Sequence, residues 1–205
     1  KHLKRAKHFF DKKYRRVPKN ISYAPKKRIR IGYFSADFRK HAVMFLIKGL
    51  FRLHNKNKFD IYIYSLNSKE DELTEELKKS VNVFRNLSDI SDENAALIAR
   101  EDSLDIAVDL MGYTKNTRLS IFSLRVAPIQ ISYLGYPGST GADCMDYLIA
   151  DKVIIPDEFR KFYSEKVIHM PNCYQCNDSS RKTSEKNYSK NELGLPEDAF
   201  VFACF

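Results

Sequence analysis

Apolar residues gather in short runs from residue 28 onward, and most runs are followed by a stretch with helical spacing. The run at 104–110 (LDIAVDL) is almost continuously apolar, as in a parallel strand that is covered on both faces. These patterns predict strands at 28–34, 59–66, 81–87, 104–110, 128–134, 146–150 and 164–170, and helices at 42–53, 70–80, 91–101 and 117–125. Alternating strands and helices are typical of an α/β fold with a Rossmann-like, doubly wound parallel sheet.

The two ends of the chain depart from this alternation. Residues 1–27 set apolar positions among basic ones at nearly helical spacing before Pro18 and Pro25, which predicts a basic N-terminal helix and a connector. Residues 28–171 form the sheet-bearing unit, and residues 172–190 read as a polar linker without an apolar period. Residues 191–205 end in the apolar run 200–205, which predicts the first strand of a second lobe that is cut off here.

The composition permits a large buried core, because 43% of the residues are apolar and 14 Phe and 12 Tyr are among them. No apolar run reaches the ~18 residues that a membrane-spanning helix needs, and residues 1–16 lack the apolar region of a secretory signal. A cytoplasmic protein without membrane contact is therefore expected. The net charge of +9 lies largely in 1–30 and 181–190, which favours a solvated basic surface over nucleic-acid binding.

The four cysteines do not form a disulfide framework. Cys173 and Cys176 make a single C-x-x-C pair, and His169 is the nearest further candidate for a metal ligand. A zinc site built on these three would lack its fourth ligand. Buried or incidental thiols are expected, and no metal site.

Three segments directly follow predicted strands: 35–41, 109–114 and 135–141. In an open α/β sheet, ligands bind beyond the carboxyl ends of the strands. The first segment contains Asp37 and His41, and His41 stands at a predicted helix start, where the helix dipole favours a neutral ring. A neutral imidazole can accept a proton or hydrogen-bond a sugar hydroxyl. The alternative, that His41 only caps the helix, is equally open.

The other two segments offer a carboxylate, a hydroxyl and glycines. Asp109 is the last polar residue of an otherwise apolar strand. Its carboxylate either positions an acceptor substrate or binds nearby backbone N–H groups, and the second interpretation is favoured. Thr114 supplies a hydroxyl group. Gly135, Gly138 and Gly141 let the backbone approach a ligand closely, but their spacing fits neither a dinucleotide nor a triphosphate motif. These segments mark a site without identifying its reaction.

Longer motifs identify a family. RIRIGYFSADFRKHAV (28–43), the block 104–151 and YSEKVIHMPNCY (163–174) resemble the O-linked N-acetylglucosamine (O-GlcNAc) transferase family of protein glycosyltransferases, especially its bacterial members. The resemblance covers about residues 28–205 and implies a GT-B architecture, of which this chain supplies the first of two Rossmann-like lobes. It also implies metal-independent, inverting transfer of N-acetylglucosamine from UDP-GlcNAc to Ser or Thr of acceptor proteins, without a cofactor. Upstream tetratricopeptide repeats are expected, and the fragment alone is expected to be inactive.

The resemblance carries over to single positions. His41 matches the family's active-site histidine, and Thr114 matches a residue that lines the same cleft, which Asp37 and Asp109 would also border. Four residues match the loop on the acceptor side of that cleft: Gly135, Tyr136, Pro137 and Gly138. Tyr113 stands where many bacterial members have His, which leaves His41 as the main catalytic candidate.

Two other functions stay open. One is a non-catalytic protein-binding module that keeps the lobe without the chemistry. The other is a related GT-B enzyme that uses another sugar or an Asn acceptor, because the contacts that select the donor sugar would lie beyond Phe205.

Overall fold

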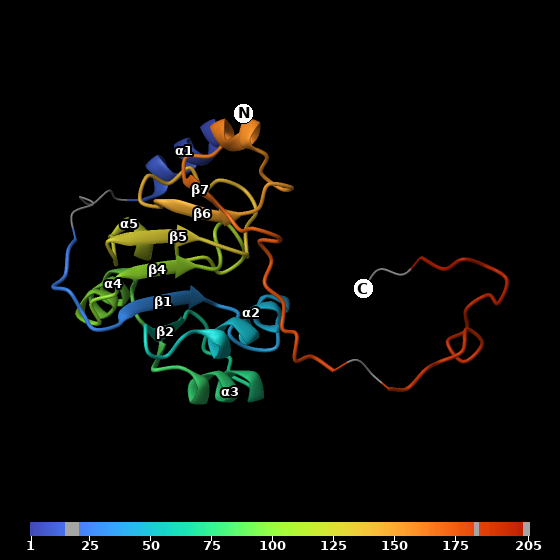
Figure 1. Ribbon diagram of the computed structural model, residues 1–205. Coiled ribbons are helices and arrows are strands. Elements are labelled where there is room, and N and C mark those ends of the chain that lie inside the picture. The colour runs from blue at the N-terminus through green and yellow to red at the C-terminus, as the bar shows by residue number, and fades with distance from the viewer. Residues whose placement is uncertain (15–20, 183–184, 203–205) are drawn as a thin grey trace.

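The computed structural model describes residues 1–14, 21–182 and 185–202. Its centre is one parallel sheet in the order β3-β2-β1-β4-β5-β6-β7 (Figure 1). The strands are β1 (Ile29–Ser35), β2 (Phe59–Ser65), β3 (Val83–Asn86), β4 (Ile106–Asp109), β5 (Ile129–Ser132), β6 (Tyr147–Ala150) and β7 (Lys166–His169). This confirms the expected α/β fold. The strand order reverses between β1 and β4, and such a switch point is where open sheets bind ligands.

Helices cover both faces of the sheet, as the doubly wound arrangement requires. They are α1 (His2–Lys13), α2 (Ala42–Leu53), α3 (Glu72–Ser80), α4 (Asp92–Glu101), α5 (Ser120–Ser123) and the 3-10 helix η1 (Asp157–Phe162). Alternate residues of one strand serve the two faces: Tyr33 packs with α2 and α3, whereas Phe34 packs with α1, α4 and α5. The strands therefore need apolar residues at successive positions, which explains their continuous apolar runs.

The helix predicted at 117–125 is wrong in length, since only the four residues of α5 are α-helical. Arg125 takes a positive φ of 58° that a helix cannot contain. Its buried guanidinium instead donates to the Cys144 carbonyl at 2.8 Å and to the Asp146 carboxylate at 2.7 Å. The sequence also gave no sign of η1.

The N-terminal helix α1 packs on the sheet-bearing unit through buried Ala6 and Phe10. Further contact comes from His2, whose Nε2 lies 3.1 Å from the Ser139 carbonyl oxygen. In Figure 1, α1 lies near the β6–β7 end of the sheet. None of the helices within the described residues is long and apolar enough to cross a bilayer.

The segment after β7 is held on α2 before it leaves the sheet. Asp178 is buried against α2, where its Oδ1 accepts hydrogen bonds from Arg52 Nη2 at 2.7 Å and from the Ser180 hydroxyl at 2.8 Å. The later part of the segment runs away from the sheet (Figure 1). Residues 200–202 do not form the predicted strand, and the rest of that prediction, 203–205, lies outside the described residues.

Candidate functional site

The loops after β1, β4 and β5 meet at the carboxyl edge of the sheet, beside the switch point. Together they enclose a cavity of about 260 Å³, here called the edge hollow. Its lining residues come from all three loops and from the start of α2: Asp37, Arg39, His41, Val43, Leu110, Thr114, Lys115, Asn116 and Gly135. The structure thus brings four of the predicted site residues, which lie up to about a hundred positions apart in the sequence, into one cavity.

His41 both caps a helix and faces the edge hollow. Its Nδ1 accepts a hydrogen bond from the Val43 N–H at 3.3 Å, and 39% of its side chain is exposed. Because Nδ1 is the acceptor, the proton of the neutral ring resides on Nε2, which makes Nε2 a donor. The Asp37 Oδ2 lies 3.6 Å from the same Nδ1.

Two cations stand beside this pair. Arg39 Nη2 lies 3.7 Å from Asp37 Oδ1, which is an ion pair but too long for a hydrogen bond. The Arg39 Nε is buried and has no hydrogen-bond partner among the described residues. Lys115 lines the same hollow. These cations were not singled out in the sequence, although Lys115 directly follows Thr114 and Arg39 lies midway between Asp37 and His41.

Asp109 supports the edge hollow from below and does not line it. The residue is 2% exposed, and its carboxylate accepts hydrogen bonds from the N–H groups of Met111 and Gly112, each at 2.9 Å. Burial raises the pKa of this carboxyl to about 6. Gly112 adopts a positive φ of 55°, which lets the loop turn back toward its own strand. Of the two interpretations of Asp109, the geometry matches the one in which it binds backbone.

The two parts of the loop after β5 contact different regions: the first faces the edge hollow and the second faces α1. Gly135 lines the edge hollow, and a Cβ there would stand 1.9 Å from the Leu110 carbonyl oxygen, so no side chain fits. Tyr136 turns toward α1 instead: its ring packs edge-on against Tyr113 at 5.7 Å and lies 6.4 Å from the ring of His2. Tyr136, Pro137 and Gly138 do not line the edge hollow.

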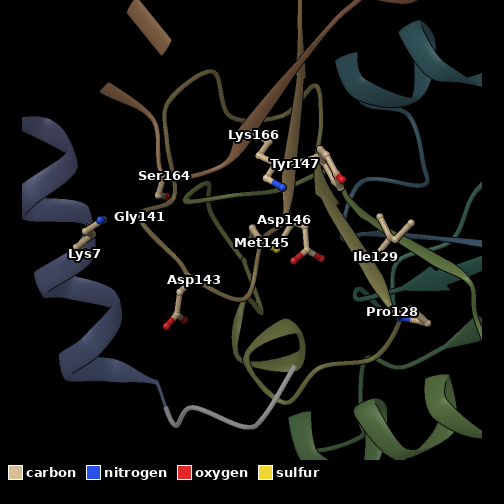
Figure 2. Close-up of a pocket in the computed structure, with 10 residues that line it drawn as sticks. All are labelled: Lys7, Pro128, Ile129, Gly141, Asp143, Met145, Asp146, Tyr147, Ser164 and Lys166. Carbon is tan, nitrogen blue, oxygen red and sulfur yellow. The ribbon is translucent and has the colours of Figure 1, made fainter. Parts of the chain in front are cut away.

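A larger cavity, of about 440 Å³, lies at the opposite edge of the sheet. Figure 2 shows it between α1, which contributes Lys7, and the amino ends of β5 to β7, where Ile129 and Lys166 stand. The Asp146 carboxylate in its wall already accepts from Arg125 at 2.7 Å and from the Gln130 N–H at 2.9 Å. This carboxylate joins neighbouring loops, and Gly141 is the one lining residue of the cavity that the sequence analysis had named.

No group of three or more metal-ligating side chains with suitable geometry occurs within 1–14, 21–182 and 185–202. The C-x-x-C pair leaves Cys173 exposed and Cys176 half-buried. The ring of His169 is directed elsewhere, with Nε2 at 2.8 Å from the Ile155 carbonyl oxygen.

Known proteins match this chain over most of its length. The model of glycosyl transferase family 41 matches residues 3–191. A probable UDP-N-acetylglucosamine–peptide N-acetylglucosaminyltransferase (SEC) of Arabidopsis thaliana is 38% identical over 87% of this chain and 19% of its own length. The Caenorhabditis elegans UDP-N-acetylglucosamine–peptide N-acetylglucosaminyltransferase is 34% identical over 75% and 14%.

A solved structure matches the fold as well. A mutant O-GlcNAc transferase of Thermobaculum terrenum superposes with a TM-score of 0.75 and 28% identity, over 84% of this chain and 33% of that one. The chain therefore spans about a fifth or less of the curated relatives named above, and a third of the solved one.

Proposed function

This chain belongs to glycosyl transferase family 41, and from that premise we propose that it forms the first lobe of a UDP-GlcNAc protein O-glycosyltransferase. The enzyme would transfer N-acetylglucosamine to Ser or Thr hydroxyls of acceptor proteins, with inversion and without a metal or other cofactor. Relatives named as peptide N-acetylglucosaminyltransferases support the donor and the acceptor class.

The observation that carries the proposal is the edge hollow at the switch point of the sheet. It combines an imidazole, a hydroxyl and a side-chain-free backbone turn, at His41, Thr114 and Gly135. At about 260 Å³ it falls just below the ~300–1,000 Å³ of a complete ligand pocket. This size suits one half of a cleft whose other half is supplied by a second lobe.

The chemistry follows from what faces the hollow. In an inverting transfer the acceptor oxygen attacks the anomeric carbon, the bond from that carbon to the diphosphate breaks, and the hydroxyl proton passes to a base. His41 holds its Nδ1 on the Val43 N–H, so its Nε2–H is set to donate to a substrate oxygen. To act as the base, Nε2 must first be unprotonated, with the proton on Nδ1 facing Asp37. The positive charges of Arg39 and Lys115 favour an anionic leaving group nearby.

The test uses the full-length gene product that contains this chain, supplied with a panel of nucleotide sugars and with peptides that carry Ser, Thr or Asn. Transfer from UDP-GlcNAc to Ser or Thr is expected, unchanged by a metal chelator, and detected by mass spectrometry. His41→Ala should lower kcat/KM by about a hundredfold or more. His41→Asn, which retains a capping side chain, should be equally impaired. Full activity of both variants, or transfer from another sugar only, contradicts the proposal.

A non-catalytic protein-binding module is the competing function. It predicts that the full-length protein binds acceptor peptides with undiminished affinity in the His41→Ala variant and transfers no sugar at all. The proposal further includes upstream tetratricopeptide repeats, which the family resemblance implies, and a cytoplasmic location, which the sequence analysis expects. Cell fractionation with an antibody to this chain tests the location.

A further inference from the structure

Another, largely apolar pocket borders the loop that also lines the edge hollow. It has a volume of about 370 Å³ and lies between α1 and the loop that follows β4. Here it is called the α1 pocket. Its lining residues are His2, Arg5, Ala6, Phe9, Lys13, Tyr14, Tyr113 and Thr117.

The α1 pocket and the edge hollow share one short stretch of backbone. Tyr113 lines the α1 pocket, the next three residues, 114–116, line the edge hollow, and Thr117 lines the α1 pocket again. Consecutive Cα atoms are about 3.8 Å apart. The two cavities are therefore close together, and a few residues of an acceptor polypeptide are enough to span the distance between them.

The aromatic wall of the α1 pocket is formed in advance. The Tyr113 ring packs edge-on against Phe9 at 5.3 Å, and its hydroxyl donates to the Thr140 carbonyl at 2.7 Å. Phe9 nevertheless remains 46% exposed. An exposed aromatic surface that is fixed from behind binds an apolar side chain at little cost in ordering.

The rim of the α1 pocket is cationic. Arg5 and Lys13 line it, Lys13 Nζ lies 5.3 Å from the ring centres of Phe9 and Tyr14, and none of the lining residues is a carboxylate. In addition, the Thr117 hydroxyl oxygen is buried without a hydrogen-bond partner among the described residues. A ligand that combines an apolar side chain with negative charge and a backbone carbonyl would satisfy all these groups.

We propose that the α1 pocket is a subsite for the acceptor polypeptide. It holds an apolar, preferably aromatic, side chain that has Asp or Glu beside it, a few residues from the hydroxyl that receives the sugar. A second copy of this chain fits less well, because the chain carries a net charge of +9 and would bring further positive charge to a cationic rim. This inference rests on the proposed function.

The first arm of the test varies the acceptor. A series of peptides contains one Ser each and an Asp-Phe pair, and the number of residues between the pair and the Ser, on either side, differs from peptide to peptide. For each peptide, kcat/KM is measured with the full-length protein. Over a narrow range of distances kcat/KM should rise about tenfold or more relative to peptides with Lys-Ser in place of the pair. The gain should shrink at high salt.

The second arm varies the pocket. Phe9→Ser and Arg5→Glu should each remove most of that gain by raising the KM for the Asp-Phe peptides. For the peptides that carry Lys-Ser instead, kcat should be unchanged. Phe159→Ser is the matched apolar control, because Phe159 is 48% exposed on η1. Lys4→Glu is the matched charge control, since Lys4 is exposed on α1 and does not line the pocket. Neither control should alter the gain.

The third arm separates the inference from the proposed function. Binding of a fluorescent Asp-Phe peptide to the 205-residue chain is measured by anisotropy, with the same four variants. Binding that Phe9→Ser abolishes supports the subsite even if no sugar is transferred by the full-length protein. If the full-length protein transfers sugar at a rate that depends neither on the Asp-Phe pair nor on the pocket variants, the subsite is contradicted but the proposed transferase function is not. A change in oligomeric state upon Phe9→Ser, without any effect on peptides, overturns it in favour of a second copy.

Discussion

Two groups of residues build the edge hollow, and they differ in how tightly the rest of the protein holds their polar groups. The supporting group, Asp109, Gly112 and Gly135, is tied to the main chain by short hydrogen bonds or by direct backbone contact. The other group, Asp37 and His41, is called the exposed group because both side chains line the hollow; its interactions are one capping hydrogen bond at 3.3 Å and ion-pair distances of 3.6 Å and 3.7 Å. A buried polar group that is bonded to backbone is closed to a ligand, whereas an accessible and loosely bonded group can rearrange onto one. Stability and chemistry should therefore be separable by mutation.

The largest loss of stability is expected at Gly135. In Gly135→Ala, the new Cβ would meet the Leu110 carbonyl oxygen at 1.9 Å, and this backbone is itself fixed by a hydrogen bond from the Leu110 N–H to Phe34 at 3.0 Å. The free energy of unfolding should fall by about 3 kcal/mol or more, as measured by urea denaturation. Gly194→Ala is the comparison variant: nothing lies within 4 Å of its added Cβ, so only its positive φ of 66° opposes the substitution, and the free energy of unfolding should fall by no more than about 1 kcal/mol. Equal stability of the two variants would remove Gly135 from the supporting group.

A smaller effect, dependent on pH, is expected at Asp109. Its pKa in the folded chain is about 6, above the ordinary 3.8 of the unfolded chain. Between these two values the folded state binds more protons, so this carboxyl stabilises the fold fully below about pH 4, and the stabilisation is lost as the pH rises through about 6. The difference in unfolding free energy between the native chain and Asp109→Asn should thus fall by up to about 3 kcal/mol from pH 4 to 7. A difference that rises with pH would show that the two N–H donors outweigh burial.

The smallest effect on stability is expected at His41, in the exposed group. His41→Asn preserves a side-chain acceptor for the Val43 N–H, so the unfolding free energy of the 205-residue chain should change by less than about 0.5 kcal/mol. His41→Ala removes the cap and should cost about 1 kcal/mol. Thermal unfolding followed by circular dichroism measures both. A loss of several kcal/mol in His41→Asn would place this residue with the supporting group and end the comparison.

Much of the fold was predictable because local signals agreed with burial. The helix at 42–53 begins and ends as predicted, since its apolar face is continuous and His41 caps it. Ser91 caps α4 by accepting from the Asn94 N–H, as its position before a charged helical stretch suggested. The strands were recognisable because both of their faces are covered, which makes them apolar throughout.

Less of the site was predictable, because a motif does not reveal where each side chain of a loop points. Asp109 and Thr114 stand in one predicted segment, yet the first is buried under the loop and the second lines the hollow. Gly135 and Tyr136 are adjacent, yet the packing of Tyr136 on Tyr113 turns the rest of that loop toward α1. These separations depend on contacts between distant segments, which no local pattern encodes.

The anchoring of Asp178 on α2 has a mechanical consequence. The residues that grip its carboxylate, Arg52 and Lys48, are on the same helix that His41 opens. The chain therefore leaves the sheet-bearing unit from a point that is fixed to α2, the helix whose first turn His41 caps.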